Sequence, residues 1–139
     1  PLSINALRED LQLAHRTVAS WLSALERLYA IFRLAPFGAP RIRAVRKEQK
    51  HYHFNWAVVP DDTARFENLV AVHLLKWVHF QQDTAGRDVD LRYFRGLRYL
   101  QTRYAAAEAW RISARGGKHY QTPDGIAVAP ALELLRKLV

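Results

Sequence analysis

The fold is decided by residues 3–29, SINALREDLQLAHRTVASWLSALERLY, in which two apolar stripes with helical spacing follow one another. The residues of the two stripes are Ala6, Leu7 and Leu11, then Val18, Leu22, Leu25 and Tyr29. Only about four residues separate the stripes, so the two helices must cross at a steep angle. Ser3 is a suitable N-cap for the first helix, and the second is expected from about Arg16 to Tyr29. The pattern predicts a helix-turn-helix, which presents a helix N-terminus to a partner, most often a DNA major groove.

A basic hairpin is expected directly after this helix pair. Ile31–Leu34 is predicted to be a short strand that ends before the proline- and glycine-containing stretch 36–40. Residues 41–47, RIRAVRK, alternate basic and apolar side chains, which favours a strand with one cationic face. Residues 52–56 continue as an aromatic strand. The sequence therefore predicts a winged helix over residues 1–50, with its wing at about 36–50.

A second domain is expected over residues 51–139. Its most secure element is a helix over 64–80 that starts near Asp61 and Asp62, where negative charge suits the helix dipole. The wide apolar face predicted for this helix consists of Phe66, Leu69, Val70, His73, Leu74 and Trp77. After a loop at 81–88, the pattern predicts strands at 89–94, 109–113 and 119–122, and helices at 97–103 and 131–138. This alternation predicts a mixed α/β (α+β) fold.

Composition indicates a polyanionic partner. The chain has 21 Lys and Arg against 13 Asp and Glu, a net charge of +8, which fits duplex DNA, although a basic protein without such a partner is the alternative. The absence of cysteine excludes disulfides and thiolate zinc sites. Neither a membrane-spanning apolar run nor a secretory signal is visible, so we expect a cytoplasmic protein without membrane contact. The chain contains no Met, and we interpret it as a fragment of a longer protein.

Several stretches resemble the C-terminal region of prokaryotic AAA-type ATP-binding proteins. The resemblance spans nearly the whole chain, and its most specific parts are the helix-turn-helix and residues 65–70, RFENLV, with further matches at Pro36 and at residues 52–56, YHFNW. In that family, a domain of unknown function follows a P-loop ATPase module, and a winged helix precedes a fold similar to restriction endonucleases. The resemblance implies an upstream ATPase module in cis, and ATP and Mg²⁺ are expected only there.

The chain departs from the family in two ways. It has no P-loop, because Gly116-Gly117-Lys118 lacks the first glycine and the spacing of a Walker sequence. In addition, Val89–Arg95 resembles the first core strand, but the family's hairpin and Glu-x-Lys strand are missing between Arg95 and Gly96. Either the gene has a deletion, or a loop is missing from this sequence. A divalent metal is expected only if that gap hides a nuclease motif.

Candidate DNA contacts lie on the second helix and in the basic segment. Arg16 is placed to read a base, and Thr17 and Ser20 to hold phosphates. The basic cluster also includes Arg33, and its candidate phosphate contacts are Arg41, Arg43, Arg46, Lys47 and Lys50. Such a density suits phosphates, because each neutralised phosphate releases counterions. A solvated loop that protects an edge strand is the alternative.

No complete catalytic site is visible, so an enzymatic role in this chain stays open. Glu67 and Asp90 are candidate remnants of a metal site, although a lone Glu67 is more typical of a salt-bridged helix residue. His51 and His53 share one strand face but lack a third ligand for zinc. His73 is expected to be a core histidine. The alternative function is a protein-interaction module that docks or regulates the ATPase, with Trp21 marking its packing surface.

Overall fold

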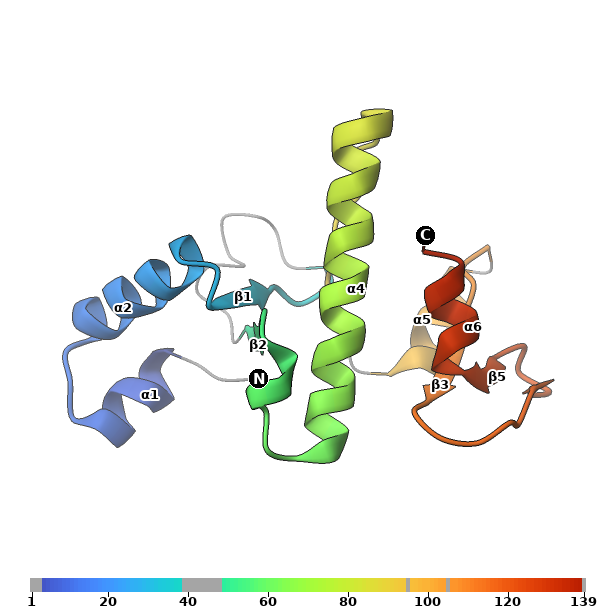
Figure 1. The fold of residues 1–139 in the computed structure, drawn as a ribbon, viewed down its shortest axis with the longest axis horizontal. Coiled ribbons are helices and arrows are strands. Elements are labelled where there is room, and N and C mark those ends of the chain that lie inside the picture. Colours follow the sequence, from blue (N-terminus) through green and yellow to red (C-terminus); the bar gives the residue numbers. More distant parts are fainter. Residues whose placement is uncertain (1–3, 39–48, 95, 105, 139) are drawn as a thin grey trace. The chain divides into compact units, whose positions relative to one another are not determined.

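A helix pair and a two-stranded sheet open the chain in the computed structural model, which describes residues 4–38, 49–94, 96–104 and 106–138 (Figure 1). Helix α1 (Ile4–Leu11) is followed by α2 (His15–Arg27), and the turn between them places Gln12 at a left-handed φ of 53°. The predicted helix-turn-helix segment therefore forms two separate helices within one residue or two of the expected bounds. Ser3 lies outside the described residues.

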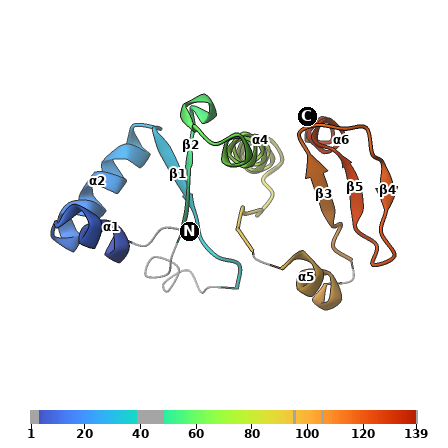
Figure 2. The same cartoon turned by 90° about the horizontal axis from the view of Figure 1, so that it is seen from below.

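Strands β1 (Ile31–Leu34) and β2 (Lys50–His53) pair antiparallel, with Arg33 opposite His51. Side chains alternate between the two faces of a strand, so this small sheet has two apolar faces. On one face, Ile31 joins Val18 and Leu22 of α2. The other face carries three buried residues that contact Ala71 of the long helix α4 (Asp62–Ala85), namely Phe32, Leu34 and Tyr52. The sheet thus lies between α2 and α4 (Figure 2).

Four residues of the predicted apolar stripes are exposed, namely Ala6, Leu11, Leu25 and Tyr29. Leu11 and Leu25 have exposed fractions of 51% and 41%, whereas Val18 and Leu22 are buried as expected. Leu7 packs against this core as expected, and Ile4 and Leu13, which were not predicted, join it. The physical reason is the turn at Gln12, which points Leu13 rather than Leu11 toward α2.

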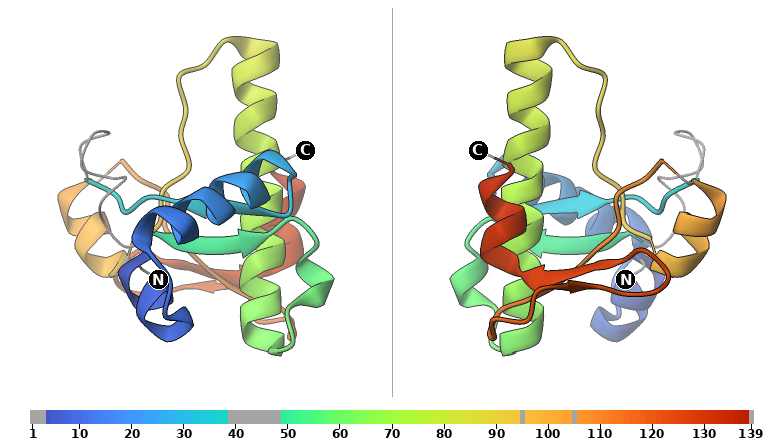
Figure 3. Two further views of the ribbon diagram at one scale, coloured as in Figure 1. Left: turned by 90° about the vertical axis from the view of Figure 1, so that its left-hand side faces the viewer. Right: turned by 90° about the vertical axis from the view of Figure 1, so that its right-hand side faces the viewer.

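Helix α4 crosses the two strands rather than running along them (Figure 3). The Asp61 side chain caps it, because its Oδ1 accepts a hydrogen bond from the Ala64 backbone N–H at 2.7 Å. The helix continues to Ala85, so the loop predicted from Gln81 is wrong in its first five residues. Gly86 ends the helix in a left-handed conformation (φ 60°), with reverse hydrogen bonds to the last turn.

The face that α4 buries is not the predicted one. Its buried residues are Asn68, Ala71 and Val78, whereas His73, expected in the core, is exposed. The helix is apolar around most of its circumference, so spacing alone could not choose between two faces. A short 3-10 helix, η1 (Trp56–Val58), replaces the end of the predicted aromatic strand and leads into α4.

Residues Phe94–Val139 form a second unit, and Pro1–Tyr93 the first. Helix α5 (Leu97–Arg103) has the predicted bounds, and strands β3 (Trp110–Ser113) and β4 (Tyr120–Gln121) lie within the predicted ones. The central strand, β5 (Ala127–Pro130), was not predicted. It pairs parallel with β3 and antiparallel with β4, which leaves β4 at an edge of this sheet.

Helix α6 (Ala131–Arg136) follows β5 directly and has Pro130 as its N-cap. The buried residues of this unit are small or aliphatic, and Ile126 and Ala129 are the most buried, at 2% and 0% exposed. The short Ala-Val-Ala-Pro strand carries little β propensity of its own, which is why its sequence indicated only the start of a helix.

One predicted strand is absent. Residues 89–94 form only an isolated bridge, in which Tyr93 pairs with Pro36. The Tyr93 N–H donates to the Ala35 carbonyl at 3.2 Å, and the Phe37 N–H donates to the Tyr93 carbonyl at 2.9 Å. No longer partner strand lies beside this segment in the described part of the chain. Arg95 lies outside the described residues, so the expected gap between Arg95 and Gly96 stays a prediction.

Among the described residues the protein is therefore a mixed α+β chain with five α-helices and two small sheets. The domain boundary expected after residue 50 falls inside β2, whereas the compact units divide between Tyr93 and Phe94. None of the described helices is long and apolar enough to cross a membrane.

Candidate functional site

The outward face of α2 collects polar side chains in a regular stripe. Val18 and Leu22 hold the helix against the sheet, and the residues on the opposite side are Arg16, Ser20, Ser23 and Arg27. Their spacing of four, three and four residues places them in one line along the helix. Arg16, Ser20 and Arg27 are exposed, and Ser23 is half-buried. We call these four residues the polar stripe.

Both arginines of the polar stripe are available for a partner. Within the described parts of the chain, neither Arg16 nor Arg27 has an ion pair or a hydrogen bond from its side chain. The first turn of α2 contains no acidic residue, and its N-cap, Ala14, has no side-chain oxygen that could accept from the free backbone N–H groups. A helix start of this kind attracts anions, because its N–H groups and its dipole are uncompensated.

One residue predicted as a DNA contact, Thr17, lies away from the polar stripe. Thr17 is half-buried at the side of α2, so it contributes less to the outward face than Ser20 does. Sequence reasoning missed Ser23 and Arg27, although the helical repeat from Arg16 and Ser20 could have identified both. Arg41, Arg43, Arg46 and Lys47 lie outside the described residues.

Arg33 is occupied by an internal ion pair. Its Nε donates to Oε1 of Glu26 at 2.8 Å, and its Nη2 donates to Oε2 at 2.5 Å, so the contact is bidentate. The two side chains are only 18% and 32% exposed. This ion pair joins α2 to β1. Because Arg33 neutralises Glu26, the carboxylate of Glu26 is not left to pair with the adjacent Arg27.

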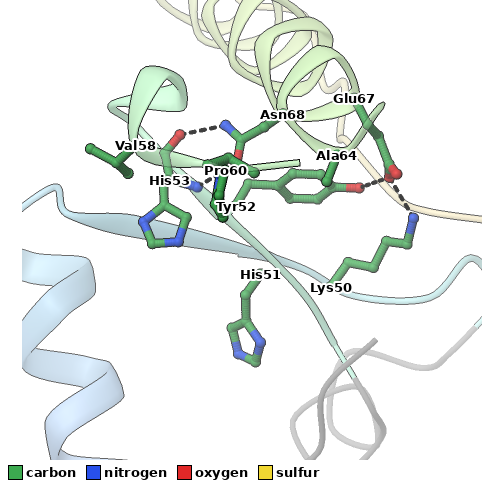
Figure 4. Close-up of a pocket in the computed structure, with 10 residues that line it drawn as sticks. Lys50, His51, Tyr52, His53, Val58, Pro60, Ala64, Glu67 and Asn68 are labelled. Carbon is green, nitrogen blue, oxygen red and sulfur yellow. Dashed lines mark hydrogen bonds and ion pairs between the residues drawn. The ribbon is translucent and has the colours of Figure 1, made fainter. Parts of the chain in front are cut away.

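A hollow of about 470 Å³ lies between β2 and the start of α4 (Figure 4). At one end, the carboxylate of Glu67 accepts hydrogen bonds from the Lys50 ammonium group and from the Tyr52 hydroxyl, the latter at 2.8 Å. Lys50, a predicted phosphate contact, is therefore paired with an acid. Glu67 is a salt-bridged helix residue, which matches the alternative to a metal role.

Burial and hydrogen bonds at this end of the hollow shift the pKa values of Tyr52 and Glu67. Burial, followed by the hydrogen bond to Glu67, raises the pKa of Tyr52 well above its usual range. Partial burial alone would raise the pKa of Glu67, but the hydrogen bonds from Lys50 and Tyr52 outweigh it and lower that pKa. At neutral pH, Glu67 is thus held as a carboxylate and Tyr52 as a neutral phenol.

Asn68 closes the other end of the hollow. Its Oδ1 accepts from the His53 backbone N–H at 2.8 Å, and its Nδ2 donates to the His53 carbonyl at 2.6 Å. The side-chain amide therefore forms the two hydrogen bonds with the His53 backbone that a residue of a neighbouring strand would form. Asn68 is 3% exposed, and this buried polar contact was not predicted from the sequence.

His51 and His53 point to the same side of β2, away from Tyr52 and Glu67 (Figure 4). Both ring nitrogens of His51 are buried and have no hydrogen-bond partner in the described residues. Burial, reinforced by the positive charge of Arg33, lowers the pKa of His51. His51 is thus held as a neutral imidazole beside the Glu26–Arg33 pair.

The candidate metal residues do not come together into a site. The Nε of Arg92 donates a hydrogen bond to Oδ2 of Asp90 at 2.7 Å, and Glu67 forms its ion pair with Lys50. In the ranges that the structure describes, no group of three or more His, Asp or Glu side chains is arranged to hold a metal ion.

These observations define a helix pair and hairpin, with a cationic outer helix face, joined to a second small α+β unit. Residues 1–60 match the profile of a family described as a domain of unknown function (DUF8612). The match covers the helix pair, the sheet and η1, which is less than half of the chain. No curated protein and no solved structure matches the chain.

Proposed function

We propose that this chain binds duplex DNA, with α2 as the helix that enters the major groove. The observation that carries the proposal is the polar stripe, in which two arginines without acidic partners among the described residues flank two serines on the outward face of α2. A major groove about 12 Å wide admits one such helix, and arginine is the side chain most often used to read guanine.

The remainder of the interface follows from the order of the elements. A helix pair followed by an antiparallel hairpin is the arrangement of a winged helix, with the connection between β1 and β2 as its wing. That connection contains Arg41, Arg43, Arg46 and Lys47, which would contact phosphates. Lys50 and Arg33 are not assigned to phosphates, because Glu67 and Glu26 bind them.

We further propose that the chain acts as the DNA-binding part of an AAA-type ATPase, as the sequence resemblance implies. ATP and Mg²⁺ would then bind to the ATPase module in cis and not to the residues of this chain. The second unit would correspond to the nuclease-like domain of that family.

The test is titration of a fluorescent duplex with the full chain at several salt concentrations. The R41A/R43A/R46A variant should bind all sequences more weakly and reduce the salt slope by about 3, because each lost phosphate contact removes about 0.9. Replacement of Arg16 or Arg27 with Ala should instead relax a sequence preference, at a cost of about 1–3 kcal/mol for a bidentate base contact.

Arg136→Ala is the matched control, because it removes one exposed positive charge from α6 without touching α2. Equal losses from R136A and R16A would show that net charge alone drives binding. A triple variant that binds as tightly as the parent at low salt would remove the wing from the interface. The protein-interaction alternative would then be favoured.

A further inference from the structure

A second stripe on α2 is apolar and exposed. Trp21, Leu25 and Leu28 follow one another at four and three residues, and their exposed fractions are 53%, 41% and 75%. Tyr29, just after the helix, is 72% exposed. Single exposed apolar residues are common, but a row of them at helical spacing is typical of a packing surface. The row lies to one side of the polar stripe, on the same helix.

This apolar stripe is not needed for the core of its own unit. Val18 and Leu22 already fill the contact between α2 and the sheet, and they are 2% and 8% exposed. The large residues of the stripe are absent from that cluster. Their burial would therefore be gained in an interaction with another surface.

The surroundings of the stripe are small and uncharged. Ala14, Thr17 and Ala24 lie between or beside its large side chains, and none of these positions carries a charge. Small residues let two helices approach closely, and alternating large and small side chains can interdigitate. In a chain with a net charge of +8, a charge-free face is where two copies can meet without repulsion.

The order of the residues is self-complementary. Trp21 is the middle residue of α2, which runs from His15 to Arg27. If two copies of α2 pack antiparallel about a two-fold axis at Trp21, Leu25 faces Thr17 of the second copy. Leu28 then faces Ala14 of the second copy. The two leucines thus each meet a smaller side chain, and the two Trp21 side chains meet each other at the axis.

We propose that the apolar stripe of α2 is a homodimer interface formed with a second copy of this chain. The proposal does not depend on DNA binding, but it has a consequence for it. A single helix with its side chains is about 10–12 Å across and a major groove is about 12 Å wide, so a pair of helices does not fit. Self-association through α2 and insertion of α2 into the groove therefore exclude one another.

The test is sedimentation equilibrium of the full chain over a range of concentrations. The parent should show a reversible monomer–dimer equilibrium, and Leu28→Glu and Leu25→Glu should each shift it to monomer. Because both leucines are exposed, the variants should keep the far-ultraviolet circular dichroism of the parent. Leu132→Glu is the matched control, because Leu132 is 56% exposed on α6 and should leave the equilibrium unchanged.

A parent chain that stays monomeric at every soluble concentration would overturn the proposal and leave this face to a different protein. An equal shift of the monomer–dimer equilibrium in L28E and L132E would overturn it as well, because the dimer would then not depend specifically on α2. These outcomes are independent of DNA affinity, so the failure of one proposal is distinguishable from that of the other.

Discussion

Helices α2 and α4 pack against opposite faces of the same two-stranded sheet, but they are fixed there by different polar contacts. Helix α4 uses a buried neutral amide, Asn68, which binds the backbone of His53. Helix α2 uses a charged pair, Glu26 with Arg33, at the margin of its apolar contact. Helix α4 thus forms hydrogen bonds with the backbone of the sheet, whereas α2 is joined to the sheet through side chains alone.

The difference indicates what each helix can do besides packing. Because Asn68 replaces a missing strand, α4 is tied to one register along β2 and has a structural role. Helix α2 is held by the buried Val18 and Leu22 and by one ion pair near its end, and its sides away from the sheet stay exposed. Its outward side therefore carries both the polar stripe and the apolar stripe.

The largest expected effect is that of Asn68→Ala. The variant leaves the His53 N–H and carbonyl without their partner at the edge of β2, so we expect a loss of about 2–3 kcal/mol in the free energy of unfolding. Urea-induced unfolding measures it. Asn55→Ala is the control, because Asn55 is exposed and its side chain does not cap η1. Equal stabilities of the two variants would contradict the structural role of Asn68.

A smaller effect is expected from Glu26→Ala. Arg33 would keep its charge at 18% exposure without the bidentate carboxylate, which should cost about 1–2 kcal/mol. Glu9→Ala removes an exposed acid whose pair with Arg8 is 3.5 Å long, and it should change stability by less than about 0.5 kcal/mol. If E26A were as stable as E9A, the ion pair would not fix α2 to β1.

The smallest effect concerns pH and tests the environment of His51. Because burial and Arg33 lower the pKa of His51 from 6.5, the unfolded chain binds a proton more readily than the folded one. The contribution of neutral His51 to the free energy of unfolding is then complete above pH 6.5, and it is lost as the pH decreases from 6.5 through the folded-state pKa. His51→Leu should flatten this fall in thermal unfolding between pH 7 and about 5, whereas the exposed His73→Leu should not. A parent without such a fall would contradict the neutral, unpartnered state of His51.

The candidate site could be predicted only in part, for local reasons. Arg16 and Ser20 follow from helical spacing, and Ser23 and Arg27 continue the same repeat. The engagement of Lys50 and Arg33 could not be predicted, because their partners Glu67 and Glu26 are 17 and 7 residues away. An ion pair of that separation depends on how the helices cross the sheet.

The sequence by itself determined the elements whose signal is local. The helix pair, β1, the start of α4 at Asp61 and the bounds of α5 all follow from periodicity and capping residues. Tertiary structure decided which face of α4 is buried, because that helix is apolar on more than one side and its fit to the sheet, through Ala71 and the contact of Asn68 with His53, selects a face. It also decided that Ala127–Pro130 is the central strand of its sheet, because strand pairing joins residues far apart in sequence and overrides weak local propensity.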